Sequence, residues 1–171
     1  EVDGLTERLT SIRRHLHAHP EPSGEELETT QYLAEILREQ GLLVRVAPSG
    51  RGLIAEPELA RDQRRIAVRA DIDALRVADE KDVEYRSRRP GIAHACGHDA
   101  HATIAVGAAL AFDACAAALP WPVRWRLILQ PAEETSTGAK QMVAAGAVDN
   151  VDAIVGLHLD QRFGRIEAVE A

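Results

Sequence analysis

Long hydrophobic runs, clusters of basic residues and a framework of cysteines are all missing from this sequence of 171 residues. No stretch approaches the roughly 18 consecutive apolar residues of a membrane-spanning helix, and residues 1–14 lack the apolar core of a signal peptide. The 27 acidic and 20 basic residues give a net charge of −7, so neither membrane nor nucleic acid is an expected partner. Cys96 and Cys115 lie in dissimilar surroundings and predict no disulfide. We therefore expect a soluble, cytoplasmic protein.

Helical and strand patterns alternate along the chain, and its 46% hydrophobic residues are enough for one compact domain. Ser23 and Glu26 match a capping box, which predicts the start of a helix. The predicted helices cover residues 5–16, 27–40, 100–118 and 138–145, and the predicted strands cover residues 42–47, 52–56, 66–70, 123–129, 153–157 and 163–169. Turn residues at 48–50 indicate that the first two strands form a hairpin. The alternation is typical of an α/β fold.

Polar residues follow three of the predicted strands at the point where each strand ends. Asp71 and Asp73 come after the strand that ends at residue 70. Glu133 and Glu134 follow the strand that ends near residue 129, and His158 ends the strand that starts at residue 153. Ligands of α/β sheets bind at the carboxyl ends of strands. The sequence therefore predicts a functional site at this edge of the sheet.

A histidine-rich motif, His94-Ala-Cys-Gly-His-Asp-Ala-His101, precedes the long predicted helix. We predict that Cys96 and His98 point the same way, because residues i and i+2 of an extended segment share one face. With His158 and one glutamate they supply a thiolate, two imidazoles and a carboxylate, which suit Zn²⁺ or another divalent ion. Of the two adjacent glutamates, one can coordinate while the other takes a proton from a metal-activated water.

Five short motifs stand in an order and spacing that can be compared with known families. They are residues 13–21 (RRHLHAHPE), 69–75 (RADIDAL), 94–101 (HACGHDAH), 130–134 (QPAEE) and 156–158 (GLH). The chain resembles, in these motifs, the amidohydrolase branch of the dinuclear aminoacylase and carboxypeptidase family, to which hippurate hydrolase and the plant auxin-conjugate hydrolases belong. The resemblance implies a zinc-peptidase-like catalytic domain, an α/β fold whose mixed, mostly parallel sheet is flanked by helices.

The resemblance also implies a role for each residue of the site. Glu133 would act as the general base, and Asp73 would lie next to the metals in the catalytic site. Two divalent ions, Zn²⁺ or Mn²⁺ with Co²⁺ or Ni²⁺ as alternatives, would be bound. The substrate would be a small N-acyl amino acid or a peptide-like amide, which is hydrolysed to an acid and an amine. The implied metal ligands are Cys96, which bridges the two ions, His98, Glu134 and His158.

Members of this family are roughly twice as long as the chain, as one further domain would make them. We therefore expect residues 1–171 to be the N-terminal part of a metallohydrolase catalytic domain, without the lid and dimerisation domain and without the last ligand histidine. A second chain or a further segment would then complete the site. Arg76 and Asp160 stand where the family usually has proline, and neither is a presumed ligand.

Other interpretations of the same residues stay open. His15, His17 and His19 are expected to pack or cap rather than bind metal, because residues two apart on a helix point in different directions. His94 and His101 are expected to orient ligands. For the whole chain, the alternatives to an active enzyme are a truncated, catalytically incomplete homologue that binds a metal or a partner, and a simple structural zinc site.

Overall fold

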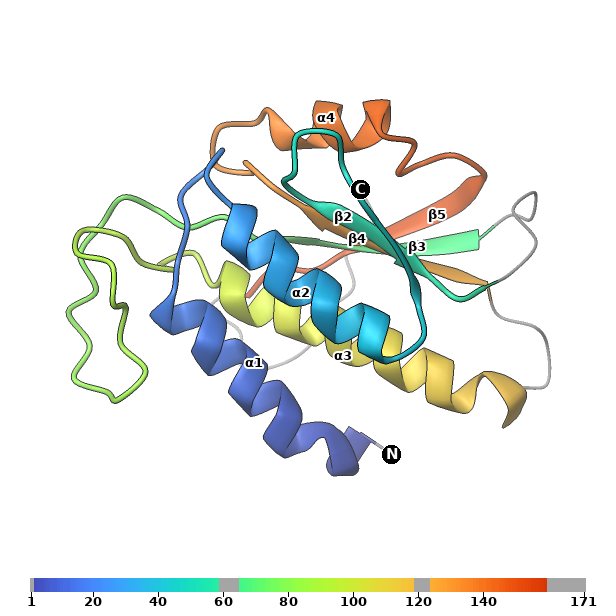
Figure 1. Cartoon of the computed structure of the whole chain (residues 1–171), viewed down its shortest axis with the longest axis horizontal. Coiled ribbons are helices and arrows are strands. Elements are labelled where there is room, and N and C mark those ends of the chain that lie inside the picture. The colour runs from blue at the N-terminus through green and yellow to red at the C-terminus, as the bar shows by residue number, and fades with distance from the viewer. Residues whose placement is uncertain (1, 59–64, 119–123, 160–171) are drawn as a thin grey trace.

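A computed structural model of the protein describes residues 2–58, 65–118 and 124–159. Within these residues five strands form one sheet in the order β1-β2-β4-β3-β5 (Figure 1). The strands, in chain order, are β1 (Leu43–Val46), β2 (Leu53–Glu56), β3 (Arg65–Asp71), β4 (Trp125–Gln130) and β5 (Val151–Gly156). The predicted strand 163–169 lies outside the described residues.

The sheet is mixed, as predicted. β1 and β2 form the expected antiparallel hairpin, and β2 is also antiparallel to β4. β3 runs parallel to both of its neighbours, β4 and β5. The carboxyl ends of β3, β4 and β5 therefore meet at one edge of the sheet, which is where the predicted site residues follow.

Helices cover the sheet unequally. The helices are α1 (Thr6–Ala18), α2 (Leu27–Glu39), α3 (His98–Cys115) and α4 (Gly138–Ala144), with short 3-10 turns at Val2–Leu5 and Ala116–Ala118. α1, α2 and α3 share the larger core cluster with residues of one sheet face. α4 lies on the other face (Figure 1), where its Met142 belongs to the second core cluster. None of these helices combines the length and the hydropathy needed to cross a bilayer. The α/β class predicted from the sequence is confirmed.

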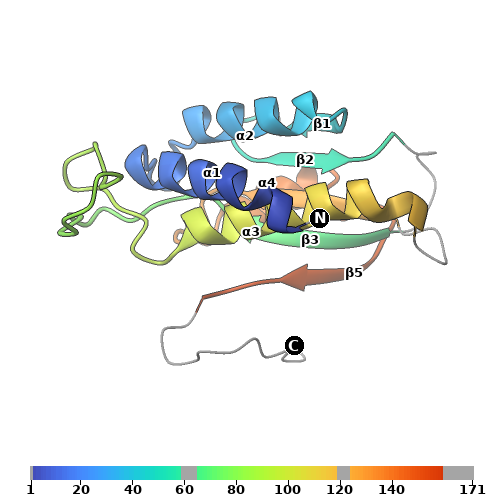
Figure 2. The same ribbon diagram turned by 90° about the horizontal axis from the view of Figure 1, so that it is seen from below.

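Burial differs sharply between the centre and the edge of the sheet. All six residues of β4 are buried, because α3 lies over one face of this strand and α4 over the other. β5 forms the edge opposite to β1, and most of its residues are exposed (Figure 2). Ile154 and Val155 of this strand are 50% and 54% exposed. The site therefore has a rigid centre and one open side.

The cap of α2 differs from the prediction, although the helix begins at the predicted residue. The helix begins at Leu27, but its N-cap residue, Glu26, makes no side-chain cap hydrogen bond. Glu21 caps the helix instead, because its Oε2 accepts the N–H of Thr29 at 2.7 Å. The Ser23 hydroxyl donates to Asp73 Oδ2 at 2.6 Å, away from the helix. The predicted capping box is wrong because both of its side chains serve contacts with distant segments.

Candidate metal centre

The candidate centre lies where β3, β4 and β5 end and α3 begins. Cys96 and His98 approach each other across a turn rather than along an extended segment, because Gly97 has a φ of +86° and His98 is already the first residue of α3. The predicted convergence of the two side chains is therefore present, but the reason given for it is wrong. A left-handed conformation at this position favours glycine, which has no Cβ.

Three of the predicted ligands offer donor atoms that lie within 4.8 Å of one another: Cys96, His98 and Glu134. Glu134 Oε1 lies 3.6 Å from His98 Nε2. His158 comes from the end of β5, and its Nε2 is 3.6 Å from Cys96 Sγ. The structure thus brings together a thiol, two imidazoles and a carboxylate from three distant segments.

His98 presents one free ring nitrogen to this group. Its Nδ1 is 3.1 Å from Asp73 Oδ1, so Nδ1 carries the proton of that hydrogen bond. Its Nε2 is buried and has no hydrogen-bond partner among the described residues. Carboxylate oxygens of Asp71, Glu133 and Glu134 lie 3.6–3.9 Å from Nε2, too far for hydrogen bonds. A lone pair surrounded by acids in this way fits a bound cation.

Burial, hydrogen bonds and neighbouring charges shift the pKa values of Cys96, His98 and Asp73. Burial and the neighbouring Glu134 raise the pKa of the Cys96 thiol to about 11. Burial alone would lower the pKa of His98, but the hydrogen bond to Asp73 and the surrounding carboxylates raise it. For Asp73, hydrogen bonds from His98, Ser23 and the Glu134 backbone overcome the effect of burial and lower the pKa to about 2. Metal binding to Cys96 would therefore release the proton of the thiol.

Glu133 lies at the mouth of the same site. Its Oε2 is 3.9 Å from His98 Nε2, and its side chain is 40% exposed, against 25% for Glu134. The two adjacent acids reach one ring because they sit in a turn and not in a strand: Ala132 just before them has a φ of +48°. Glu133 is thus close to the candidate ligands yet open to solvent, which suits a group that exchanges protons.

A second group of potential ligands consists of Asp71, His98 and His101. Both ring nitrogens of His101 are already used, since Nε2 accepts the N–H of Leu159 at 2.8 Å and Nδ1 donates to Asp71 at 2.7 Å. His101 therefore holds the backbone next to His158 in place and does not bind a cation in this arrangement. Of the two groups, the one containing Cys96 and Glu134 has the free donors.

The three histidines of residues 15–19 do not belong to the candidate centre. His17 is buried, with Nδ1 2.7 Å from Asp99 Oδ2. His15 stacks on Tyr32, with ring centroids 3.8 Å apart. His19 Nδ1 is 2.9 Å from the carbonyl oxygen of His15. The ring centroids of His15 and His19 lie 4.4 Å apart, but neither candidate metal-binding group among the described residues includes any of these three histidines.

His94 is buried next to the centre, and neither of its ring nitrogens has a hydrogen-bond partner among the described residues. Burial lowers its pKa to about 4. His94 is therefore neutral near pH 7, and it adds no positive charge that would compete with a cation at the site.

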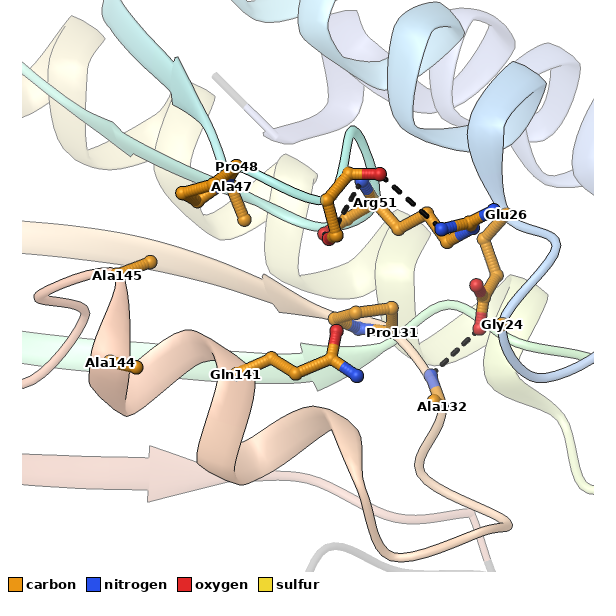
Figure 3. A pocket seen from close by; sticks show the side chains of 11 residues that line it. Gly24, Glu26, Ala47, Pro48, Arg51, Pro131, Ala132, Gln141, Ala144 and Ala145 are labelled. Carbon is orange, nitrogen blue, oxygen red and sulfur yellow. Dashed lines mark hydrogen bonds between the residues drawn. The ribbon is translucent and has the colours of Figure 1, made fainter.

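Sequence reasoning missed two contributors, Ser23 and Glu26, which it assigned to the start of a helix. Glu26 is fully buried and accepts the N–H of Ala132 at 2.7 Å. Figure 3 shows this contact at one side of a pocket between α4 and the turn after β1. None of the residues that line this pocket is a candidate metal ligand. No local sequence signal indicates this role of Glu26, because its burial and its partner 106 residues away are known only from the structure.

Comparison with known proteins identifies relatives of the chain. The model of the peptidase family M20/M25/M40 matches residues 67–168. An N-acetyl-L-cysteine deacetylase of Bacillus subtilis is 40% identical over 154 residues, which are 90% of this chain and 36% of that protein. An N-acyl-L-amino acid amidohydrolase of Geobacillus stearothermophilus is 38% identical over 159 residues, which are 92% of this chain and 42% of that protein.

A solved structure matches the fold closely. The YXEP protein of Bacillus subtilis, a dinuclear metal binding peptidase from the M20 family, has a TM-score of 0.84 and 37% sequence identity, over 92% of this chain and 44% of that chain. The chain thus spans about two fifths of the length of the relatives it matches.

Proposed function

Because the chain belongs to the peptidase family M20/M25/M40, we propose that residues 1–171 are the N-terminal part of a catalytic domain that hydrolyses the amide bond of a small N-acyl amino acid or a related peptide-like amide. The family and the α/β fold are the premises of this proposal. We propose three things beyond these premises: the substrate class, the role of each residue, and the position of the chain within a longer domain.

In the proposed reaction, Cys96, His98, Glu134 and His158 hold two divalent ions, Zn²⁺ or Mn²⁺ with Co²⁺ or Ni²⁺ as alternatives. When bound, such ions lower the pKa of a water molecule and polarise the scissile carbonyl. Glu133 accepts the proton of the attacking water and later donates it to the leaving amine. Asp73 holds Nδ1 of His98, which directs Nε2 of that ring into the site.

One observation carries this proposal. The buried Nε2 of His98 has no hydrogen-bond partner among the described residues, and it faces Glu133 and Glu134 at 3.9 and 3.6 Å. A buried polar atom without a partner costs about 1–3 kcal/mol, and three acids around it add repulsion. A cation in this position removes both penalties, whereas a site without a cation leaves them in place.

The names of the relatives support the substrate class. One relative is an N-acetyl-L-cysteine deacetylase and another an N-acyl-L-amino acid amidohydrolase. Both names describe cleavage of an acyl group from the amino group of an amino acid. We therefore propose N-acyl amino acids as the substrate class of the present chain, without specifying the acyl group or the amino acid.

The test loads the purified chain with Mn²⁺, Zn²⁺ or Co²⁺ and measures metal per chain and release of amino acid from N-acetylcysteine and hippurate. The assay is run on the chain alone and with a second polypeptide that carries the segment following residue 171 in a longer relative. Release that depends on metal and is lost in Glu133→Gln supports the proposal. A structural zinc site would instead hold one ion tightly and show no hydrolysis in either assay. The metal content per chain would then be the same in the wild type and in Glu133→Gln.

A second candidate function, a metal- or partner-binding module without catalysis, is favoured by the exposed edge of the sheet. Ile154 and Val155 of β5 expose apolar side chains on both faces of that strand. An edge strand of this kind is suited to pairing with a further segment or another chain. Metal uptake together with a stable complex, but no hydrolysis in the complex, would favour this second function.

A further inference from the structure

Glu26 is a carboxylic acid in the interior of the protein, where such groups are rare without a purpose. Its side chain is 0% exposed, and it accepts the backbone N–H of Ala132 at 2.7 Å (Figure 3). Its other oxygen, Oε2, is buried and has no partner among the described residues. Burial raises the pKa of Glu26, opposed in part by nearby backbone N–H groups. An unpaired carboxyl oxygen in this environment destabilises the fold.

The partner of Glu26 is the residue that turns the chain into the candidate site. Ala132 has a φ of +48°, a left-handed conformation that is unfavourable for an ordinary L residue. It directly precedes Glu133, so its conformation determines the direction in which Glu133 and Glu134 leave β4. The hydrogen bond from its N–H to Glu26 stabilises this turn.

Buried carboxylates hold the backbone on both sides of Glu133. Before it, the N–H of Ala132 is bound by Glu26 at 2.7 Å. After it, the N–H of Glu134 is bound by Asp73 Oδ2 at 3.1 Å. Ser23, three residues before Glu26, donates to the same Asp73 oxygen at 2.6 Å. The short segment before α2 therefore supports the turn that carries Glu133 and Glu134, directly through Glu26 and indirectly through Ser23 and Asp73.

The beginning of α2 does not require the Glu26 carboxylate. Glu26 is the N-cap residue, but it makes no side-chain cap hydrogen bond. Glu21 supplies that bond through the N–H of Thr29, at 2.7 Å. A role in starting the helix therefore leaves the long reach to Ala132 unexplained.

We propose that Glu26 is a positioning residue for Glu133 and Glu134: its hydrogen bond to the Ala132 N–H holds the turn that directs the base and a ligand at the metals. The inference rests on the proposed function for what Glu133 and Glu134 do. It adds a residue outside the ligand set whose removal is expected to weaken metal binding and catalysis. Residues that orient metal ligands typically change affinity or activity by about 10–100-fold when they are mutated.

Three substitutions separate positioning from simple stability. Glu26→Gln keeps the length of the side chain and an oxygen that accepts the Ala132 N–H, so we expect Co²⁺ affinity within about threefold of wild type. Glu26→Asp keeps an acid that is favourable at an N-cap, but it is one methylene shorter and loses the reach to Ala132. Glu26→Leu removes the acceptor altogether. We expect Co²⁺ affinity to fall at least about tenfold in Glu26→Asp and Glu26→Leu.

The measurement is a Co²⁺ titration of the full chain, followed by the absorption bands of cobalt and its thiolate, together with amide hydrogen exchange of Ala132 by NMR. The matched control is Glu28→Gln, because Glu28 is a neighbouring acid whose side chain is 76% exposed. The Ala132 amide should exchange slowly in wild type, Glu26→Gln and Glu28→Gln, and faster in Glu26→Asp. Where hydrolysis is measurable, kcat should fall with KM little changed.

The outcomes are distinguishable from those of the proposed function. A wild-type chain that takes up no Co²⁺ would overturn the metal centre, and the role of Glu26 with it. Uptake of Co²⁺ by the wild type, combined with wild-type affinity and slow Ala132 exchange in Glu26→Asp, would overturn the role of Glu26 alone. A lower Tm of Glu26→Leu with unchanged Co²⁺ affinity below that Tm would likewise reduce Glu26 to a structural residue. If Glu26→Leu misfolds, the Co²⁺ affinity and the Ala132 exchange rate of Glu26→Asp test the role of Glu26.

Discussion

Glu133 is the side chain whose removal should separate chemistry from metal binding. It lies 3.9 Å from His98 Nε2 but stays 40% exposed, and it is not one of the proposed ligands. We therefore expect Glu133→Gln to reduce amide hydrolysis on the order of 10²–10⁴-fold, while metal content per chain stays the same. Glu134→Gln is the comparison, since the loss of a ligand should lower the metal content as well. Hydrolysis at the wild-type rate by Glu133→Gln would show that another group takes the proton.

The Cys96 thiol should make metal binding depend on pH. Burial and Glu134 raise its pKa to about 11, so the thiol is protonated at neutral pH in the absence of metal. A metal binds the thiolate, and binding therefore releases a proton and strengthens as pH rises. His98, whose pKa is also raised, adds to the effect at the acidic end of the range.

The expected slope is an increase in Co²⁺ affinity of about tenfold or more per pH unit between pH 6.5 and 8.5. Calorimetry in two buffers that differ in ionisation enthalpy counts the protons released. Cys96→Ser should bind more weakly, without a thiolate absorption band and with a shallower slope. An affinity that does not change over this range would mean that Cys96 is not a ligand.

The turn between β4 and α4 is the element on which the site depends most directly. Gly138 begins α4, and a Cβ at this position would lie 1.5 Å from the carbonyl oxygen of Pro131. The backbone on both sides would have to move, and it carries Glu133 and Glu134. We expect Gly138→Ala to lower the free energy of unfolding by about 2–3 kcal/mol and to weaken metal binding.

Denaturant titration and a Co²⁺ titration of the same samples measure both effects of Gly138→Ala. Gly4→Ala is a suitable control, because a Cβ at Gly4 meets nothing within 4 Å. If Gly138→Ala and Gly4→Ala had the same free energy of unfolding and the same Co²⁺ affinity, the turn would accommodate a Cβ at residue 138, contrary to this prediction.

The same turn shows which features could be predicted from the sequence. The apolar run that became β4 and the turn residues between β1 and β2 are local signals, and both were read correctly. Contacts between distant segments leave no local signal. Ser23 and Glu26 match a capping box in spacing, yet they bind Asp73 and Ala132, 50 and 106 residues away. A local rule that fails at a fully buried residue such as Glu26 is an indication of a functional role.

The arrangement of the strands explains why the site could be located before its geometry was known. Parallel pairing of β3 with β4 and β5 brings their carboxyl ends together, which the alternation of strands and helices already implied. The position of β4 between β2 and β3 could not be predicted in the same way. The residues of a strand do not indicate that it pairs antiparallel with one neighbour and parallel with the other. The conformation of the turns, such as Gly97 and Ala132, follows from packing and not from spacing.

The whole molecule should gain stability when the site binds a cation. The chain carries a net charge of −7, and Asp71, Glu133 and Glu134 surround the free nitrogen of His98. A divalent ion offsets this repulsion in the folded state only, so metal at about 100 times its Kd should add about 2.7 kcal/mol and raise Tm by about 5–10 °C. Thermal unfolding with and without EDTA measures the shift, and Cys96→Ser, with a ligand removed, should show less of it. If metal did not change the Tm of the wild type, no cation would offset the repulsion among these acids. The metal centre proposed for this edge of the sheet would then have to be abandoned.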